Sequence, residues 1–195
     1  NYRTKRAPDE AMHNWGELRA YYGIPKEGPL TDEMAKTLIH GYYACVSYTD
    51  AQIGKVLDGL DRLGLRRSTV VVLWGDHGWK LGDYGMWCKH TEYEIDTRVP
   101  LLIRAPGMKE SGTRTDALVE LLDIYPTLCD LVGLSIPDTV EGKSLAPAMR
   151  GSTAARETLF FAYRGVQRAV QDSRFKLIEL FYFKLRRNCQ EKFAI

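Results

Sequence analysis

The stretch Thr69-Val70-Val71-Val72-Leu73-Trp74-Gly75-Asp76-His77-Gly78 decides the fold of this chain. An unbroken run of β-branched and apolar residues ends there in two adjacent residues of types that bind metal ions. Apolarity without alternation is typical of a strand that helices cover on both faces, as in a parallel sheet, and such sheets bind ligands at the carboxyl ends of their strands. Asp76 and His77 are therefore candidate metal ligands. The alternative is a turn with an aspartate and an exposed histidine, because two residues alone do not establish a coordination geometry.

The segments around this strand predict further helices and strands. Thr31 is a candidate N-cap, and apolar residues recur from there at helical spacing until Gly64, which predicts one long amphipathic helix. A second buried strand is expected at Val99 to Arg104, and another helix within residues 118–132, restarting near Asp123 because Pro126 is tolerated only in a first turn. Helix and strand in alternation favour an α/β fold with a doubly wound, mostly parallel sheet. Short strands are expected beyond residue 150, at 158–163, 167–171 and 175–179.

Composition limits the possible partners of the chain. With 195 residues, 45% of them hydrophobic, the chain can bury a substantial core. The net charge of +2 comes from interspersed charges, so we expect no nucleic-acid partner. No apolar run approaches the roughly twenty residues of a membrane-spanning helix, so we expect no membrane span. Because the chain begins without Met or a signal peptide, we expect it to be part of a longer protein. The four cysteines form no CxxC pair, and we predict buried free thiols at Cys45, Cys88, Cys129 and Cys189.

A longer segment carries a resemblance to a known family. The residues from Gly75 to Glu94, continued by Arg98-Val99-Pro100 and later by Glu141-Gly142-Lys143-Ser144-Leu145, resemble the sulfatase family of the alkaline-phosphatase-like superfamily. The resemblance implies that residues 1–150 are the C-terminal part of the α/β core. It also implies that residues 151–195 begin a small antiparallel subdomain that is truncated here, so we expect the residues after about Phe183 to be poorly ordered.

The resemblance assigns roles to four residues. Asp76 and His77 match the family's second pair of metal ligands, and the implied metal is Ca2+, although imidazole is a less usual ligand for so hard a cation. Lys89 matches the lysine that contacts the sulfate group, so it is a candidate for both catalysis and substrate binding; the alternative is an ordinary surface lysine. His90 either faces the substrate or is structural. The implied substrate is a sulfated small molecule or glycan, and the implied location is periplasmic, secreted or lysosomal.

The nucleophile that the resemblance implies is not evident in this chain. Sulfatases use formylglycine, made from Cys or Ser within Cys/Ser-x-Pro/Ala-x-Arg, and none of the four cysteines has Arg four positions later. Ser152 with Arg156 matches the pattern, but it follows the Asp-His pair, and we interpret it as a chance match. We therefore expect a formylglycine upstream of this chain and no activity from the chain alone. The other hypotheses are a phosphoesterase or phosphonate hydrolase of the same superfamily, and a non-catalytic fragment.

Overall fold

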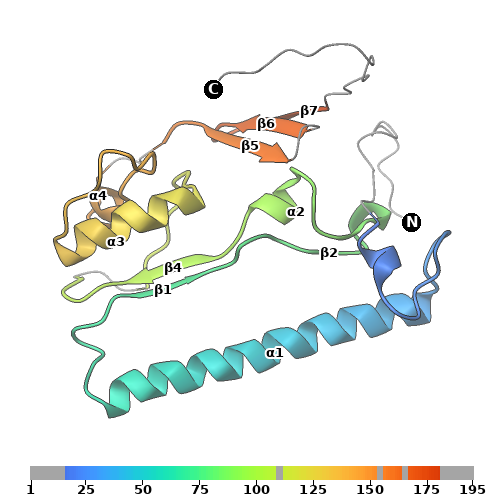
Figure 1. Ribbon diagram of the computed structural model, residues 1–195, viewed down its shortest axis with the longest axis horizontal. Coiled ribbons are helices and arrows are strands. Elements are labelled where there is room, and N and C mark those ends of the chain that lie inside the picture. The colour runs from blue at the N-terminus through green and yellow to red at the C-terminus, as the bar shows by residue number, and fades with distance from the viewer. Residues whose placement is uncertain (1–15, 109–111, 153–155, 164–166, 181–195) are drawn as a thin grey trace.

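The computed structural model describes residues 16–108, 112–152, 156–163 and 167–180, and shows mixed helices and strands (Figure 1). The elements in chain order are η2 (Leu18–Ala20), α1 (Asp32–Arg62), β1 (Val71–Trp74), β2 (Lys80–Leu81), η3 (Asp83–Gly85), β3 (Trp87–Cys88), α2 (Glu94–Thr97), β4 (Leu101–Arg104), η4 (Leu121–Asp123), α3 (Ile124–Val132), α4 (Ala146–Met149), β5 (Leu159–Tyr163), β6 (Gln167–Gln171) and β7 (Lys176–Leu180). The residues after about Phe183, which we expect to be poorly ordered, lie outside the described part of the chain.

The long helix α1 begins and ends where its sequence predicts. The Thr31 hydroxyl accepts a hydrogen bond from the backbone N–H of Met34 at 3.3 Å, and Asp32 and Glu33 stand near the positive end of the helix dipole. Gly64, with φ of +68°, follows the last turn. The helix lies along one side of the molecule and contacts β2 (Figure 1). Within the described residues, no helix has the length and apolarity that a membrane crossing requires.

The strand pairing differs from the predicted parallel sheet. β1 pairs with β4, but antiparallel, with Val71 opposite Arg104 and Trp74 opposite Leu101. All the strand pairs among the described residues are antiparallel, so the doubly wound parallel sheet is not confirmed. Parallel neighbours need a crossover that is usually a full helix. The helices between β1 and β4 are the short turns η3 and α2, neither of which is a full crossover helix, so the chain returns beside β1 in the opposite direction.

The burial of β1 also differs from the expectation. Leu73 and Trp74 are 39% and 49% exposed, and Val71 and Val72 are half-buried. The continuous apolar run predicted cover on both faces. The described residues provide only part of that cover, and large apolar side chains on α1 and β4 are exposed as well.

The C-terminal elements match the predicted antiparallel strands. β5, β6 and β7 form a three-stranded antiparallel sheet. Before them, the helix α3 ends at its C-cap Gly133, which has the left-handed conformation. Ion pairs connect this sheet to the preceding elements: Arg156 contacts Asp123 at 2.6 Å, and Lys176 of β7 contacts Glu94 of α2 at 3.3 Å. The division into residues 1–150 and 151–195 stays a prediction.

Candidate active site

Asp76 and His77 lie in the loop that follows β1. The N–H of Gly75 donates to Pro100 O at 3.0 Å, and the N–H of Gly78 donates to Asp96 O at 2.7 Å. Hydrogen bonds on both sides of the Asp76–His77 pair therefore hold it against the segment that leads from α2 into β4. A Cβ on Gly78 would lie 1.8 Å from the carbonyl oxygen of Ile95, which only glycine avoids. Asp76 is exposed, and its Oδ1 accepts the N–H of His77 at 3.0 Å.

The two side chains place one oxygen and one nitrogen close together. His77 Nδ1 lies 2.9 Å from Gly78 O, and because a carbonyl only accepts, Nδ1 carries the proton and Nε2 presents its lone pair. Nε2 lies 3.6 Å from Asp76 Oδ2. A carboxylate oxygen beside an unprotonated imidazole nitrogen fits a divalent cation. No group of three or more candidate ligands occurs in the described residues, so Asp76 and His77 would be a partial ligand set.

Lys89 directly follows β3, in a backbone of unusual conformation. Its neighbours Cys88 and His90 have φ of +65° and +82°, a left-handed region that residues other than glycine rarely adopt. Such strained residues cluster at functional sites. The Lys89 ammonium lies 4.9 Å from the centre of the Trp79 ring, and the His77 ring stacks on the same indole at 6.0 Å. Trp79 therefore contacts both the candidate metal ligand and the candidate sulfate contact.

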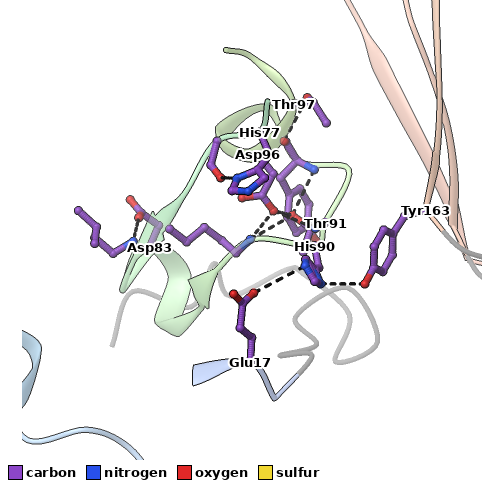
Figure 2. A network of polar contacts seen from close by, with 12 residues as sticks. Glu17, His77, Asp83, His90, Thr91, Asp96, Thr97 and Tyr163 are labelled. Atoms are coloured by element: carbon purple, nitrogen blue, oxygen red, sulfur yellow. Dashed lines mark hydrogen bonds and ion pairs between the residues drawn. The ribbon is translucent and has the colours of Figure 1, made fainter. Parts of the chain in front are cut away.

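A buried ion pair fixes the loop after Lys89. Lys80 Nζ contacts Asp96 Oδ2, and the same oxygen accepts hydrogen bonds from the N–H of Thr91, at 2.8 Å, and from the Thr91 hydroxyl (Figure 2). Lys80 is 1% exposed and Asp96 5%. This pair joins β2, α2 and the segment from Lys89 to Thr91, and so holds Lys89 and His90 in place.

Glu17, which the sequence does not single out, contacts both Lys89 and His90. Lys89 Nζ donates to Glu17 Oε1 at 2.7 Å, and the Tyr21 hydroxyl donates to the same oxygen at 3.1 Å. His90 Nε2 lies 3.6 Å from Glu17 Oε2 (Figure 2). Burial raises the pKa of the Glu17 carboxyl, but the hydrogen bonds from Lys89 and Tyr21 and the nearby positive charges outweigh it, so this pKa lies below its ordinary value. Glu17 is therefore ionised at neutral pH.

His90 also contacts the C-terminal sheet. Its Nδ1 lies 2.8 Å from the hydroxyl of Tyr163, at the end of β5 (Figure 2). If the hydroxyl is the donor, Nε2 carries a proton and presents it toward the Glu17 carboxylate. The opposite tautomer would turn a lone pair toward that negative charge, so the geometry favours donation by Tyr163. No signal in the sequence links Tyr163 or Glu17 to this loop, because they lie 73 and 72 residues away from their partners.

The prediction of buried free thiols is confirmed for Cys88 and Cys129 but is wrong on burial for Cys45, which lies on the exposed helix α1. The buried thiol near the site, Cys88, is not suited to be a nucleophile. Cys88 and Cys129 are buried and free, Cys45 is exposed and free, and Cys189 lies outside the described residues. Burial raises the pKa of the Cys88 thiol, so it stays protonated at neutral pH. Burial and the neighbouring Cys88 and Glu17 raise the pKa of Tyr21 to about 12. Tyr21 therefore keeps the proton that it donates to Glu17.

The serine pattern that resembles a formylglycine motif has its arginine engaged elsewhere. The Arg156 guanidinium donates to both carboxylate oxygens of Asp123, at 2.6 and 3.0 Å, and contacts Glu120 at 2.9 Å. Ser152 follows α4, and α4 lies at the opposite end of the molecule from β2 (Figure 1). Both observations support the interpretation of this pattern as a chance match.

Comparison with known proteins identifies the family. Residues 5–134 match the sulfatase family, and residues 82–190 match the family described as N-sulphoglucosamine sulphohydrolase, C-terminal. The solved structures similar to this chain are sulfatase and alkaline-phosphatase-like domains. The chain belongs to the sulfatase family.

Individual relatives are similar over part of their length. A sulfatase of Formosa agariphila is 41% identical over 63% of this chain and 24% of its own length. Human iduronate 2-sulfatase is 34% identical over 67% of this chain and 29% of its own length. The chain thus spans about a quarter to a third of the curated relatives that it matches.

Solved structures are similar as well. A phosphonate monoester hydrolase from Silicibacter pomeroyi has a TM-score of 0.73 and 32% identity, over 82% of this chain and 35% of that chain. The protein BT4656, solved in complex with its substrate D-glucosamine-2-N,6-O-disulfate, has a TM-score of 0.62 and 28% identity, over 68% of this chain and 29% of that chain.

Proposed function

We propose that the protein containing this chain hydrolyses sulfate monoesters, with Asp76 and His77 as ligands of a divalent cation and Lys89 as a contact of the sulfate group. The observation that carries the proposal is the shared contact with Trp79, which joins His77 and Lys89 in the loop after β1. Family membership supports it. Asp76 and His77 lie at the start of this loop, and Lys89 lies further along it. We expect an anion bound beside Trp79 to contact both Lys89 and the cation held by Asp76 and His77.

The side chains suit a tetrahedral anion. The Lys89 ammonium has three N–H donors, and Glu17 takes one of them, which leaves two for sulfate oxygens. A cation held by Asp76 and His77 would supply positive charge where negative charge gathers on the sulfate group. We place the formylglycine nucleophile in a part of the protein outside this chain, because the cysteines lack the required arginine. We favour Ca2+, as the family resemblance implies.

The favoured substrate is a sulfated sugar. BT4656, a structural neighbour, is described with a disulfated glucosamine as its substrate. His90 is the residue of this chain that we assign to the substrate beyond the sulfate group, because its ring lies beside Glu17 and next to Lys89.

A second candidate function is the hydrolysis of phosphonate monoesters. The similarity to the Silicibacter pomeroyi enzyme favours it, and so does His77, because an imidazole nitrogen suits transition metals better than it suits calcium. Metal analysis of the purified full-length protein separates the two: calcium favours the sulfatase, and a bound transition metal together with phosphonate turnover favours the alternative.

The roles of Asp76 and Lys89 are tested in the full-length protein with an aryl sulfate. Asp76→Asn and Lys89→Ala should each lower kcat/KM by about a hundredfold or more, since each removes charge that stabilises the transition state. Added calcium should partly restore Asp76→Asn, because its defect is weaker metal binding, and should leave Lys89→Ala unchanged. Lys55→Ala, an exposed lysine of α1, is the matched control and should keep wild-type rates.

The outcomes decide between the assigned roles. Equal rescue of both variants by calcium would show that the roles are wrongly assigned, and full activity in either would remove that residue from the site. The isolated chain of 195 residues should give no turnover, because its described residues offer a partial set of metal ligands and none of its cysteines lies in a nucleophile motif. Turnover by the isolated chain that disappears in Ser152→Ala would instead make Ser152 the nucleophile.

A further inference from the structure

We propose that Glu17 determines which anions the site accepts, favouring singly charged esters such as sulfate monoesters over doubly charged phosphate monoesters. The inference rests on the proposed function, because it takes Lys89 as the contact of the anion. Glu17, the residue just before η2, lies outside the sequence motif. Its carboxylate nevertheless contacts Lys89 and His90, the two residues that follow β3.

The carboxylate offsets the charge that would attract the substrate. Glu17 Oε1 lies 2.7 Å from the Lys89 ammonium, and Oε2 lies 3.6 Å from His90 Nε2. The Lys89, Glu17 and His90 side chains are only 25%, 23% and 28% exposed, so water screens their charges incompletely. Lys89 and Glu17 together carry no net charge. An anion that binds Lys89 therefore also experiences a fixed negative charge nearby.

Glu17 is held in this position as a carboxylate. Tyr21 donates to the same oxygen as Lys89, and the pKa of Tyr21 of about 12 keeps that donor protonated. The Trp79 ring, 4.9 Å from the Lys89 ammonium, also limits where the ammonium can move. Oε2 is shielded from solvent and accepts no hydrogen bond from the described residues. A carboxylate fixed in this way repels each additional negative charge on a ligand of Lys89.

The charge of the ester then decides how well it binds. A sulfate monoester carries one negative charge, whereas a phosphate monoester is doubly charged above its second pKa of about 6. The second charge is repelled by Glu17, and like-charge contacts in a partly desolvated site are costly. A phosphonate monoester is singly charged as well, so the same carboxylate is compatible with both candidate functions.

The experiment compares an aryl sulfate with the matching aryl phosphate at pH 8, in the full-length protein. Glu17→Gln keeps the shape and an acceptor oxygen for Lys89 but removes the charge. It should raise the ratio of kcat/KM for the phosphate to that for the sulfate by about tenfold. Glu17→Asp keeps the charge and should keep the wild-type ratio. Glu27→Gln, an exposed glutamate between η2 and α1, is the matched control and should change neither rate.

The ratio separates specificity from a merely structural role. If Glu17 only holds the loop, Glu17→Gln lowers both rates together and the ratio stays constant, which overturns the inference; a ratio that falls overturns it too. If the wild type hydrolyses an aryl phosphonate monoester and not the sulfate, the proposed function fails, and the phosphonate takes the place of the sulfate in the same ratio. If nothing is turned over, the two esters serve as binding probes in calorimetry, and Glu17→Gln should favour the phosphate by the same factor.

Discussion

Lys80 is a lysine with almost no exposure, and a single carboxylate makes its burial possible. Asp96 supplies that carboxylate, and Thr91 donates two hydrogen bonds to the same oxygen. A buried charge that loses its partner is far more costly than an exposed one, because neither water nor protein compensates for it. The loop that contains Lys89 and His90 thus depends on a residue pair that takes no part in the proposed chemistry.

Asp96→Asn should lower the free energy of unfolding by about 3 to 5 kcal/mol, because it leaves the Lys80 ammonium buried without a countercharge. Urea denaturation of the full-length protein measures this change. Glu33→Gln is the control, since it removes the exposed Glu33–Lys36 pair and should cost less than about 1 kcal/mol. Similar losses in the two variants would mean that Lys80 is not buried as described.

At the scale of elements, the connection from β1 into the site loop depends on one glycine. Gly78→Ala would bring a Cβ to 1.8 Å from Ile95 O, so we expect a loss of about 3 kcal/mol or more, or failure to fold. Gly54→Ala in α1 meets no atom within 4 Å and should instead stabilise the protein by about 0.5 to 1 kcal/mol. Thermal unfolding of both variants checks the contrast, and a Gly78→Ala protein as stable as the wild type would contradict it.

A second element-scale prediction concerns the link between Asp123, the last residue of η4, and the segment before β5. Burial raises the pKa of Asp123, but Arg156 and the N–H groups of Lys143 and Glu120 outweigh it, so this pKa lies below the ordinary 3.8. A carboxyl group with a lowered pKa stabilises the folded state above 3.8, and this contribution is lost as the pH falls below that value. The free energy of unfolding should therefore fall with pH below about 4, and less steeply in Asp123→Asn. Urea titrations at several pH values measure the slopes; Asp138→Asn, on an exposed turn, should keep the wild-type slope.

At the scale of the whole molecule, local signals predict the elements and fail to predict their partners. Thr31 marks the start of α1 and Gly133 the end of α3, because caps depend on neighbouring residues only. The antiparallel return of β4 beside β1 depends on contacts between distant segments, and no local pattern contains it. The same holds for the site: Lys89 stands in a recognisable motif, whereas Glu17 reaches it through the fold.

The exposed apolar surface predicts the behaviour of the isolated chain. Tyr48 and Val56 of α1 are exposed, as are Trp74 of β1 and Leu102 of β4, and a monomer rarely exposes so many large apolar side chains together. The isolated chain should therefore self-associate in sedimentation velocity experiments. Tyr48→Glu with Val56→Lys should reduce the self-association, whereas Lys55→Glu on the same helix should not. A monomeric wild-type chain at the highest concentration tested would contradict the prediction.

The position of Trp79 makes ligand binding at the site measurable by intrinsic tryptophan fluorescence. Indole emission responds to charges and to groups that quench it on contact, and Trp79 contacts both the His77 ring and the Lys89 ammonium. Occupation of either side chain by a ligand changes the surroundings of this fluorophore without any label. The difference in emission between the wild type and Trp79→Phe isolates its signal from the other tryptophans. Cation and anion binding can thus be followed separately, by titration, before any substrate is known.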